Sequence, residues 1–477
     1  MATPRKSLIP LAIVCASYAA TAAAATDAER ISALEEQLNR QRAAMQEQQR
    51  MIEAMDAELR QLKASQSGVV TSDTPVVVES EAPTVATASD QPSQKLSVNV
   101  YGFAQADAIY DFKRVDPNWE DTLRVTTIPT QSGLYGEDGN FVFSVRQSRL
   151  GVAGNYGDDI TFKLEGELFG VGSDEGQTTL RLRHAWATYK NFGMGQTWSN
   201  FMDIDIFPNT IDYWGPTGMV FYRNKQARYS LPMGEDELSF SIEDPSTALT
   251  VGRFRDLDFC NLPEPPLDCE SVESTLGEQF QAHNDLPDFT VRYRNNGDFG
   301  HYQVAGMLRK LGYERLDTGT KDDELGWGIN TSAGLNTWGR DMLKLQVAFG
   351  EGIGNYMNDG GVDIAPDSAN IEKAEAEAVP LLGISAYYDH YWSDKWSTSV
   401  GWSMIDLDTS NGQGASEFEK GQIAQINLLH YPMDHVLLGT EFIWGQREDI
   451  DGNKGEDYRI QFSLKVDFDT GDLLRME

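Results

Sequence analysis

The stretch DYRIQFSLKVDF, residues 457–468, alternates strictly between apolar and polar side chains. Its apolar positions are Tyr458, Ile460, Phe462, Leu464, Val466 and Phe468. Because successive side chains of a strand point to opposite sides of the sheet, this pattern predicts a β-strand with one apolar and one charged face. The apolar face would meet a second sheet in a soluble sandwich, and lipid in an outer-membrane barrel.

Similar alternation recurs from Lys95 onwards. In ITFKLEGELFG, Ile160 and Phe162 lie on one side, opposite Lys163, Glu165 and Glu167. The connections between such segments fall into two kinds, which alternate along the chain. Seven are short turn sequences: GNYGDD, KN, LPMGED, NNGD, WGRD, SD and PMD. Eight are longer and polar, near residues 113–139, 171–178, 198–222, 246–285, 312–323, 352–379, 408–418 and 448–456.

This sorting of loops divides residues 95–468 into about sixteen strands with both ends on the short-turn side. Outer-membrane barrels have an even strand number, short periplasmic turns and long outer loops, whereas a sandwich has no reason to sort its loops. Aromatic residues near strand ends would form the girdles at the membrane boundaries: Tyr387, Tyr388, Tyr391, Trp392 and Trp396. We therefore predict an all-β, 16-stranded antiparallel transmembrane β-barrel, followed by a tail at 469–477.

The N-terminal part follows other patterns. Residues 1–25 have a basic start, an apolar run and small residues, as in a secretory signal peptide. Residues 26–63 carry a heptad seam, with Ile and Leu at most core positions and two Gln breaks, which predicts a periplasmic coiled coil that could be trimeric. The alternative is a single solvated helix. Residues 64–94, rich in Ser, Thr, Pro and Ala, predict a flexible linker.

Composition restricts the class of protein further. The chain has 39 Lys and Arg against 73 Asp and Glu, a formal net charge of -34, which argues against nucleic acid as a partner. Mean hydropathy is -0.43, and beyond the N-terminus no stretch has the ~18 apolar residues that a membrane helix needs. Cys260 and Cys269 bracket a Pro-rich segment, and in an oxidising compartment we expect a disulfide rather than a metal or redox pair.

The lining of the predicted barrel is richer in cations than the net charge suggests. Polar parity assigns Arg181, Arg183, Arg228, Arg292 and Arg294 to the lumen. Arg146 and Arg149 have opposite parity, so a bulge or a boundary position must place one of them. A solute meets the lining at close range, where fields are focused, so an anion-preferring pore is favoured. The alternative is that the arginines pair with Glu165, Glu167 and similar acids to brace the wall.

The loop at 198–222 is unusually apolar for a surface loop. Exposure of its aromatic and aliphatic side chains to water would be costly, so we expect it to fold inward and narrow the channel. Its candidate constriction residues are Phe201, Asp203, Asp205 and Trp214. Packing against a neighbouring subunit is the alternative.

The segments VYGFAQADAIYDF, RQSRLGV, LRLRHAWATY and GQTWSNFMDIDIFPNTIDYWGPTG resemble the DcaP-like porins of the outer membrane. This resemblance implies a homotrimer held by barrel and coiled coil, passing small anionic solutes such as dicarboxylates. It also implies an arginine-bearing constriction at Arg146, Arg149, Arg181 and Arg183. Outer-membrane lipid and lipopolysaccharide are further expected partners. No cofactor or metal is expected.

Two other functions compete with a diffusion channel. The barrel could merely anchor the periplasmic coiled coil, as a structural envelope tether. A barrel enzyme is disfavoured, because the six histidines are scattered and the chain contains neither a G-x-S-x-G motif nor metal-spaced histidine pairs.

Overall fold

The computed structural model describes the part of the chain that forms the predicted barrel. The described residues are 96–255, 280–316, 318–370 and 373–473. The predicted signal peptide, coiled coil and linker, and the cysteine pair Cys260 and Cys269, lie outside these residues.

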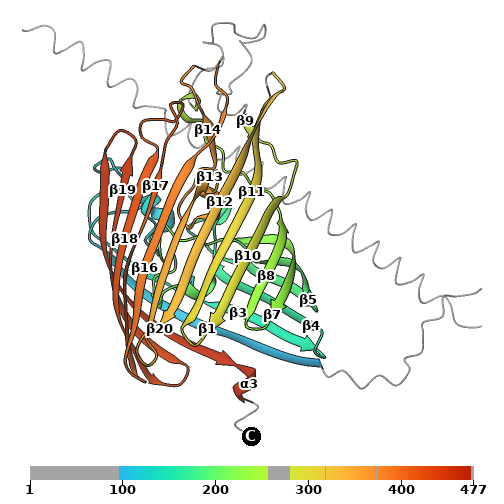
Figure 1. The fold of residues 1–477 in the computed structure, drawn as a ribbon. Helices are drawn as coiled ribbons and strands as arrows, with labels where there is room; N and C mark the ends of the chain where they lie inside the picture. The colour runs from blue at the N-terminus through green and yellow to red at the C-terminus, as the bar shows by residue number, and fades with distance from the viewer. Residues whose placement is uncertain (1–95, 256–279, 317, 371–372, 474–477) are drawn as a thin grey trace, which may run out of the picture. The chain divides into compact units, whose positions relative to one another are not determined.

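Sixteen antiparallel strands close into a ring, in which each strand pairs with the next and β20 pairs back with β1 (Figure 1). They are β1 (Leu96–Asp111), β3 (Arg149–Tyr156), β4 (Ile160–Phe169), β5 (Thr178–Tyr189), β6 (Phe192–Trp198), β7 (Arg223–Met233), β8 (Asp236–Glu243), β10 (Asp288–Gly297), β11 (Gly300–Arg315), β12 (Thr320–Asn336), β13 (Met342–Glu351), β16 (Pro380–Ser393), β17 (Trp396–Leu407), β18 (Phe418–Met433), β19 (Val436–Asp449) and β20 (Lys454–Asp469). The predicted 16-stranded antiparallel barrel is confirmed.

Short strands add to this ring. β2 (Asn140–Ser144) continues the line of β3 along β1, and β9 (Phe280–Ala282) continues β10 along β11. β14 (Ile364–Pro366) and β15 (Ala376–Ala378) form a separate small hairpin. Single 3-10 turns lie in the loops, and α3 (Thr470–Leu473) follows β20. No helix among the described residues is long and apolar enough to cross a membrane.

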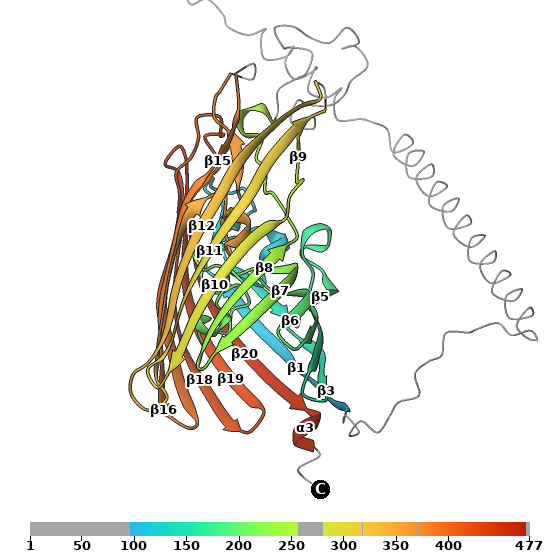
Figure 2. The same cartoon turned by 45° about the vertical axis from the view of Figure 1, so that its right-hand side comes forward.

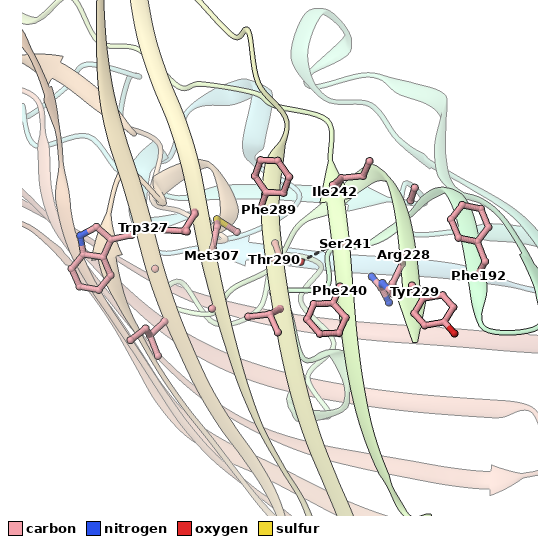
Figure 3. Close-up of a pocket in the computed structure, with 16 residues that line it drawn as sticks. Phe192, Arg228, Tyr229, Phe240, Ser241, Ile242, Phe289, Thr290, Met307 and Trp327 are labelled. Carbon is pink, nitrogen blue, oxygen red and sulfur yellow. Dashed lines mark hydrogen bonds between the residues drawn. The ribbon is translucent and has the colours of Figure 1, made fainter. Parts of the chain in front are cut away.

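The alternation of side chains separates an apolar outer face from a polar lumen. In β20, Phe462 is 53% exposed on the outer face, whereas Arg459 and Gln461 are fully buried inside. Figure 3 shows the same division across β7 to β12: Phe240 and Phe289 line an outward apolar groove, and Ser241 and Thr290 join by a 2.6 Å hydrogen bond. The apolar face of residues 457–468 therefore points out of the barrel, as predicted.

The connections sort to two ends of the barrel, with α3 at the short-turn end and β9 and β14 at the other (Figures 1 and 2). The long loops are L1 (112–139), L2 (170–177), L3 (199–222), L4 (244–287), L6 (352–379) and L7 (408–417). The long loops predicted at 312–323 and 448–456 are wrong. There β11 runs to Arg315 and β19 to Asp449, so only residues 316–319 and 450–453 connect the strands, because polar, charged residues extend these hairpins beyond the apolar belt.

Two irregularities break the parity that the sequence predicts. β2 ends at Ser144 and β3 begins at Arg149, so a four-residue interruption lets both Arg146 and Arg149 face inward. In β5, Glu165 pairs with His184 and Gly166 with Leu182, which makes Arg183 the extra residue of a bulge. The bulge reverses parity, so Trp186, which unbroken alternation with Arg181 and Arg183 would place on the lipid face, lies inside beside the guanidinium of Arg228.

The aromatic girdle prediction needs one correction. Tyr387 is only 1% exposed, and its hydroxyl bonds to Gln425 inside the barrel, 2.6 Å away. Trp392 is 66% exposed and fits a girdle position. Tyr387 lies on the lumen face of β16, because side chains two positions apart in a strand share a face and Ser385 and Asp389 are also buried.

Much of the hydrophobic core lies inside the barrel, where loops fold into the lumen. Its largest cluster joins Phe201, Ile206 and Met219 of L3 to Tyr356 and Met357 of L6 and to small residues of the wall. L3 therefore folds inward, as predicted, and the buried side chains pack against the protein's own barrel rather than a neighbouring subunit.

Candidate functional site

L3 runs along the inside of the wall and is held there by polar side chains from successive strands. Asn330 of β12 donates to the carbonyl of Phe201 at 2.8 Å, and Lys344 of β13 to that of Phe207 at 2.6 Å. Further along, Asn427 of β18 donates to the carbonyl of Asn209 at 2.8 Å. Buried backbone groups need hydrogen-bond partners, so these lumen side chains fix the path of a loop that has little regular structure of its own.

Asp203 is the most strongly bound side chain at the start of L3. Its carboxylate accepts hydrogen bonds from His301 at 2.9 Å, Ser332 at 2.7 Å and Arg294 at 3.1 Å. Burial alone would raise the pKa of Asp203, but the bonds from His301 and Ser332 and the charge of Arg294 together hold that pKa below its usual value. Arg294 also bonds to Asp205 at 2.6 Å. Asp203, Asp205 and His301 are close enough to share a metal, and the Arg294 guanidinium forms an ion pair with each of the two carboxylates.

Asp212 anchors the far end of L3. It accepts hydrogen bonds from the Thr122 hydroxyl at 2.8 Å and the Leu123 backbone at 3.0 Å, both in L1, and lies 3.5 Å from Arg459 of β20. The backbone of Ile211 donates to Glu441 of β19 at 2.8 Å. L3 thus connects wall strands on opposite sides of the ring and narrows the lumen between them.

The inner surface facing this end of L3 carries a cluster of cations around two carboxylates, here named the arginine cluster. Its members are Arg149, Lys163, Arg181, Arg183 and Arg223, with Glu165 and Glu167 between them. They come from β3, β4, β5 and β7, neighbouring strands whose lumen-facing positions meet.

Glu167 is at the centre of the arginine cluster and is fully buried. Its carboxylate lies 2.5 Å from Arg183, 2.9 Å from Arg181, 3.4 Å from Arg149 and 3.6 Å from Arg223. The hydroxyl of Tyr213, from L3, donates to Glu167 at 2.5 Å and accepts from Arg181 at 2.8 Å. Tyr213 therefore joins the constriction loop directly to the cluster.

The arginine cluster is not neutralised by its own acids. Five cations surround two carboxylates, a formal excess of three positive charges. Side-chain exposure is 25% for Arg149, 22% for Arg181 and 39% for Lys163, compared with 6% for Arg183. Arg183 hence braces the wall, while Arg149, Arg181 and Lys163 present charge to the lumen.

Two cavities meet at this cluster. One, of 530 Å³, is lined by Arg181 and Arg223 with Trp119 and Trp214. The other, of 370 Å³, is lined by Arg149, Arg183, Lys163 and Lys465. Trp198, Tyr213 and Phe221 line both, so these three aromatic side chains separate the two cavities. The place where the two cavities adjoin, here named the gap, is bordered by these three aromatic side chains and has cations on each side.

The other predicted site residues lie apart from this gap. Arg146 pairs with Asp121 of L1 and donates to the Gly170 carbonyl at 2.8 Å, so it fastens loops. Arg292 pairs with Glu237, and Arg228 donates to Gln226 at 3.0 Å. Phe201 is fully buried in the L3 core. Trp214 lines the 530 Å³ cavity, and the Arg124 guanidinium lies 4.6 Å from the ring centroids of both Trp214 and Trp119.

Sequence reasoning missed several members of the site. Lys163 shares lumen parity with Glu165 and Glu167, so alternation alone could have found it. Arg223 directly follows the predicted loop, where no parity had been assigned. Tyr213 reaches the gap only through the path of L3, for which the sequence has no local signal. Trp198 is the last residue of β6, where the predicted loop left its side unassigned.

A closed ring of sixteen strands, an outward apolar face and an inward loop across a charged lumen define an outer-membrane channel of the porin class. A family model described as DcaP outer membrane protein matches residues 21–238. The resemblance to DcaP-like porins predicted from the sequence is thereby confirmed over these residues.

Two solved structures are similar to the chain, and the first of them supports the barrel fold. The outer membrane channel DcaP of Acinetobacter baumannii matches with a TM-score of 0.63 at 23% identity, over 78% of this chain and 97% of that one. An anion-selective porin from Comamonas acidovorans matches with a TM-score of 0.47 at 11% identity, over 78% of this chain and 100% of that one. No curated protein matches the chain.

Proposed function

We propose that this porin is a passive diffusion channel that prefers small anionic solutes such as dicarboxylates. The observation that carries the proposal is the formal excess of three positive charges in the arginine cluster, at the gap between the two cavities. Charges that line a narrow, water-filled path act on a solute at a few ångströms, where screening is weak. The net charge of -34 belongs to the whole chain and acts from farther away.

Arginine pairing with the wall acids is the main objection to anion preference. The structure contains such pairs, yet Glu165 and Glu167 share four arginines and Lys163 between them. An incoming carboxylate would therefore still find donors on Arg149 and Arg181, the two arginines of the cluster with the greatest exposure. Guanidinium groups bind carboxylates with two parallel hydrogen bonds, which suits this role.

A solute with two carboxylates fits the arrangement of cations better than a solute with one carboxylate does. Arg181 and Arg223 face one cavity, and Arg149, Lys163 and Lys465 face the other. A solute with a carboxylate at each end can contact both groups while its carbon chain crosses the gap beside Trp198, Tyr213 and Phe221. The cations on the two sides of the gap would therefore lower the energy barrier to passage for the first carboxylate of the solute and then for the second.

We further infer a homotrimer, assembled through the barrel and the N-terminal coiled coil, with the coiled coil in the periplasm. On the side facing β6, β5 pairs only from Ala185 to Tyr189, and among the described residues Thr178–His184 meets no strand there. An unpaired strand edge at membrane depth is costly unless another chain covers it. Leu180, in this unpaired segment of β5, is 78% exposed, as expected for an apolar contact between barrels.

The reversal potential of the purified full-length protein in a planar bilayer under a salt gradient tests the selectivity. We expect anion preference, block of ion current by succinate but not by a neutral solute of equal size, and conductance steps in groups of three. Cation preference would refute the role of the arginine cluster. A complete absence of conductance would favour the tether function.

A further inference from the structure

A recess of 400 Å³ lies on the rim of the barrel at the long-loop end, away from the channel. It is formed by parts of L1, residues 113–114, 129–136 and 138, and by the ends of β19 and β20. Three cations line it, Lys113, Arg114 and Lys454, together with the acids Asp138 and Glu456. Such a group of cations stands out on a chain of net charge -34.

The recess lies at the upper edge of the outward apolar face. Directly below it on β1 and L1, Tyr110 and Phe112 are 39% and 51% exposed, with ring centroids 5.0 Å apart. The Lys113 ammonium lies 6.0 Å from the ring centroid of Tyr458. Aromatic side chains mark the boundary between acyl chains and headgroups, so the recess is at headgroup level in the outer leaflet. Leu134 of L1, 55% exposed, adds an apolar contact there.

The cations of the recess are only partly occupied by carboxylates. Lys113 pairs with Glu456 at 2.9 Å and Lys454 with Glu448 at 2.9 Å, and both pairs are well exposed to solvent. Exposed ion pairs of this kind are weak and exchange partners readily. Arg114 donates from Nε to the carbonyl of Tyr135 at 3.1 Å and, among the residues that the structure describes, forms no ion pair.

We propose that this recess binds a phosphate group of the lipopolysaccharide of the outer leaflet, with Arg114 as the principal ligand and Lys113 and Lys454 as supporting cations. The fork of the guanidinium matches two phosphate oxygens, and the ammonium groups add charge. The apolar face immediately below holds the acyl chains of the same molecule. The combination of a phosphate site and an apolar surface selects an amphiphile over a free ion. This site is separate from the proposed selectivity and can be present or absent independently of it.

The test compares lipid binding to purified full-length protein by native mass spectrometry. The probes are diphosphorylated lipid A, its dephosphorylated form and inorganic phosphate. The variant K113Q/R114Q/K454Q removes the three cations. The control K225Q/K321Q/K420Q removes the same charge at the long-loop ends of β7, β12 and β18. The variant R114K keeps the charge but loses the fork.

We expect the wild type and the control to bind diphosphorylated lipid A about tenfold more tightly than the dephosphorylated lipid, and the triple variant to lose this preference. The preference of R114K for the diphosphorylated lipid should lie between that of the wild type and that of the triple variant. Equal binding of both lipids by the wild type, or an unchanged preference in the triple variant, would overturn the proposal. Binding of inorganic phosphate as tight as that of the lipid would make this a free-phosphate site and also overturn it. Ion selectivity in the bilayer should be unchanged in the triple variant, which shows that the variant is folded.

Discussion

Neutralising the two exposed arginines of the arginine cluster should weaken anion preference without unfolding the barrel. In the variant R149Q/R181Q the formal excess of positive charge falls from three to one, while Arg183 and Arg223 remain beside Glu167. A unit charge about 4 Å from a solute in water contributes about 1 kcal/mol. Removing two would cost a bound anion about 2 kcal/mol, or about 30-fold in local concentration.

Salt reduces this effect, because the Debye length at physiological ionic strength is about 8 Å and some of the path lies farther from the cluster. We therefore expect the anion-to-cation permeability ratio to fall between about threefold and about 30-fold. The assay is the reversal potential under a salt gradient, measured for the wild type and the variant at two ionic strengths. The fall should be larger at the lower one.

The matched control is R340Q/K395Q, which removes two positive charges from the short-turn end of the barrel. Arg340 is 61% exposed and pairs with Asp394, far from Glu167 along the strands. This control should leave the permeability ratio within about twofold of the wild type, since both charges lie in short turns at the end of the barrel and neither pairs with Glu165 or Glu167. An equal change in both variants, or none in R149Q/R181Q, would show that the arginine cluster does not determine selectivity.

Three further predictions concern the constriction loop and the assembly. Tyr213→Phe keeps the ring stacked on Phe169 but removes the hydroxyl that joins Glu167 and Arg181. We expect this substitution to lower the free energy of unfolding by about 1–3 kcal/mol in thermal unfolding. An unchanged Tm would contradict a stabilising role of the Tyr213 hydroxyl. The pKa of Asp203 is lower in the folded protein than its ordinary 3.8, so its stabilising effect is present above that value and is lost as the pH falls through the folded pKa. Conductance of the wild type should therefore become noisy on acidification, whereas D203N should be equally noisy at neutral pH; identical pH profiles would argue against the anchor. Leu180→Ser should weaken the oligomer in native mass spectrometry, whereas Leu325→Ser, at a site 62% exposed on β12, should not, and a stable oligomer in both would move the interface elsewhere.

The architecture of the barrel follows closely from the sequence. Alternation with a period of two assigns each strand residue to lipid or lumen, and turn sequences mark the strand ends, so local patterns suffice for strand number and for the facing of Phe462 and Arg459. The prediction fails where one residue is added or where pairing stops. The bulge at Arg183 turns Trp186 inward, and the break after Ser144 turns both Arg146 and Arg149 inward. Such events depend on the neighbouring strand, which the local sequence does not contain.

The candidate site, like the barrel, has features that the sequence predicts and features that depend on the neighbouring strands. Alternation and composition are enough to place arginines and acids together on the lumen face and to require burial of the apolar loop at 198–222. Which of these charges meet depends on how the chain folds in three dimensions. Glu167 gathers Arg149, Arg181, Arg183 and Arg223 from three other strands, and Tyr213 reaches it because wall side chains hold L3 across the lumen. The alternation of apolar and polar residues predicts on which side of the sheet a residue lies. The position of that residue around and along the barrel is set by strand register and by the path of the loops. These positions determine the net charge that a solute meets in the lumen.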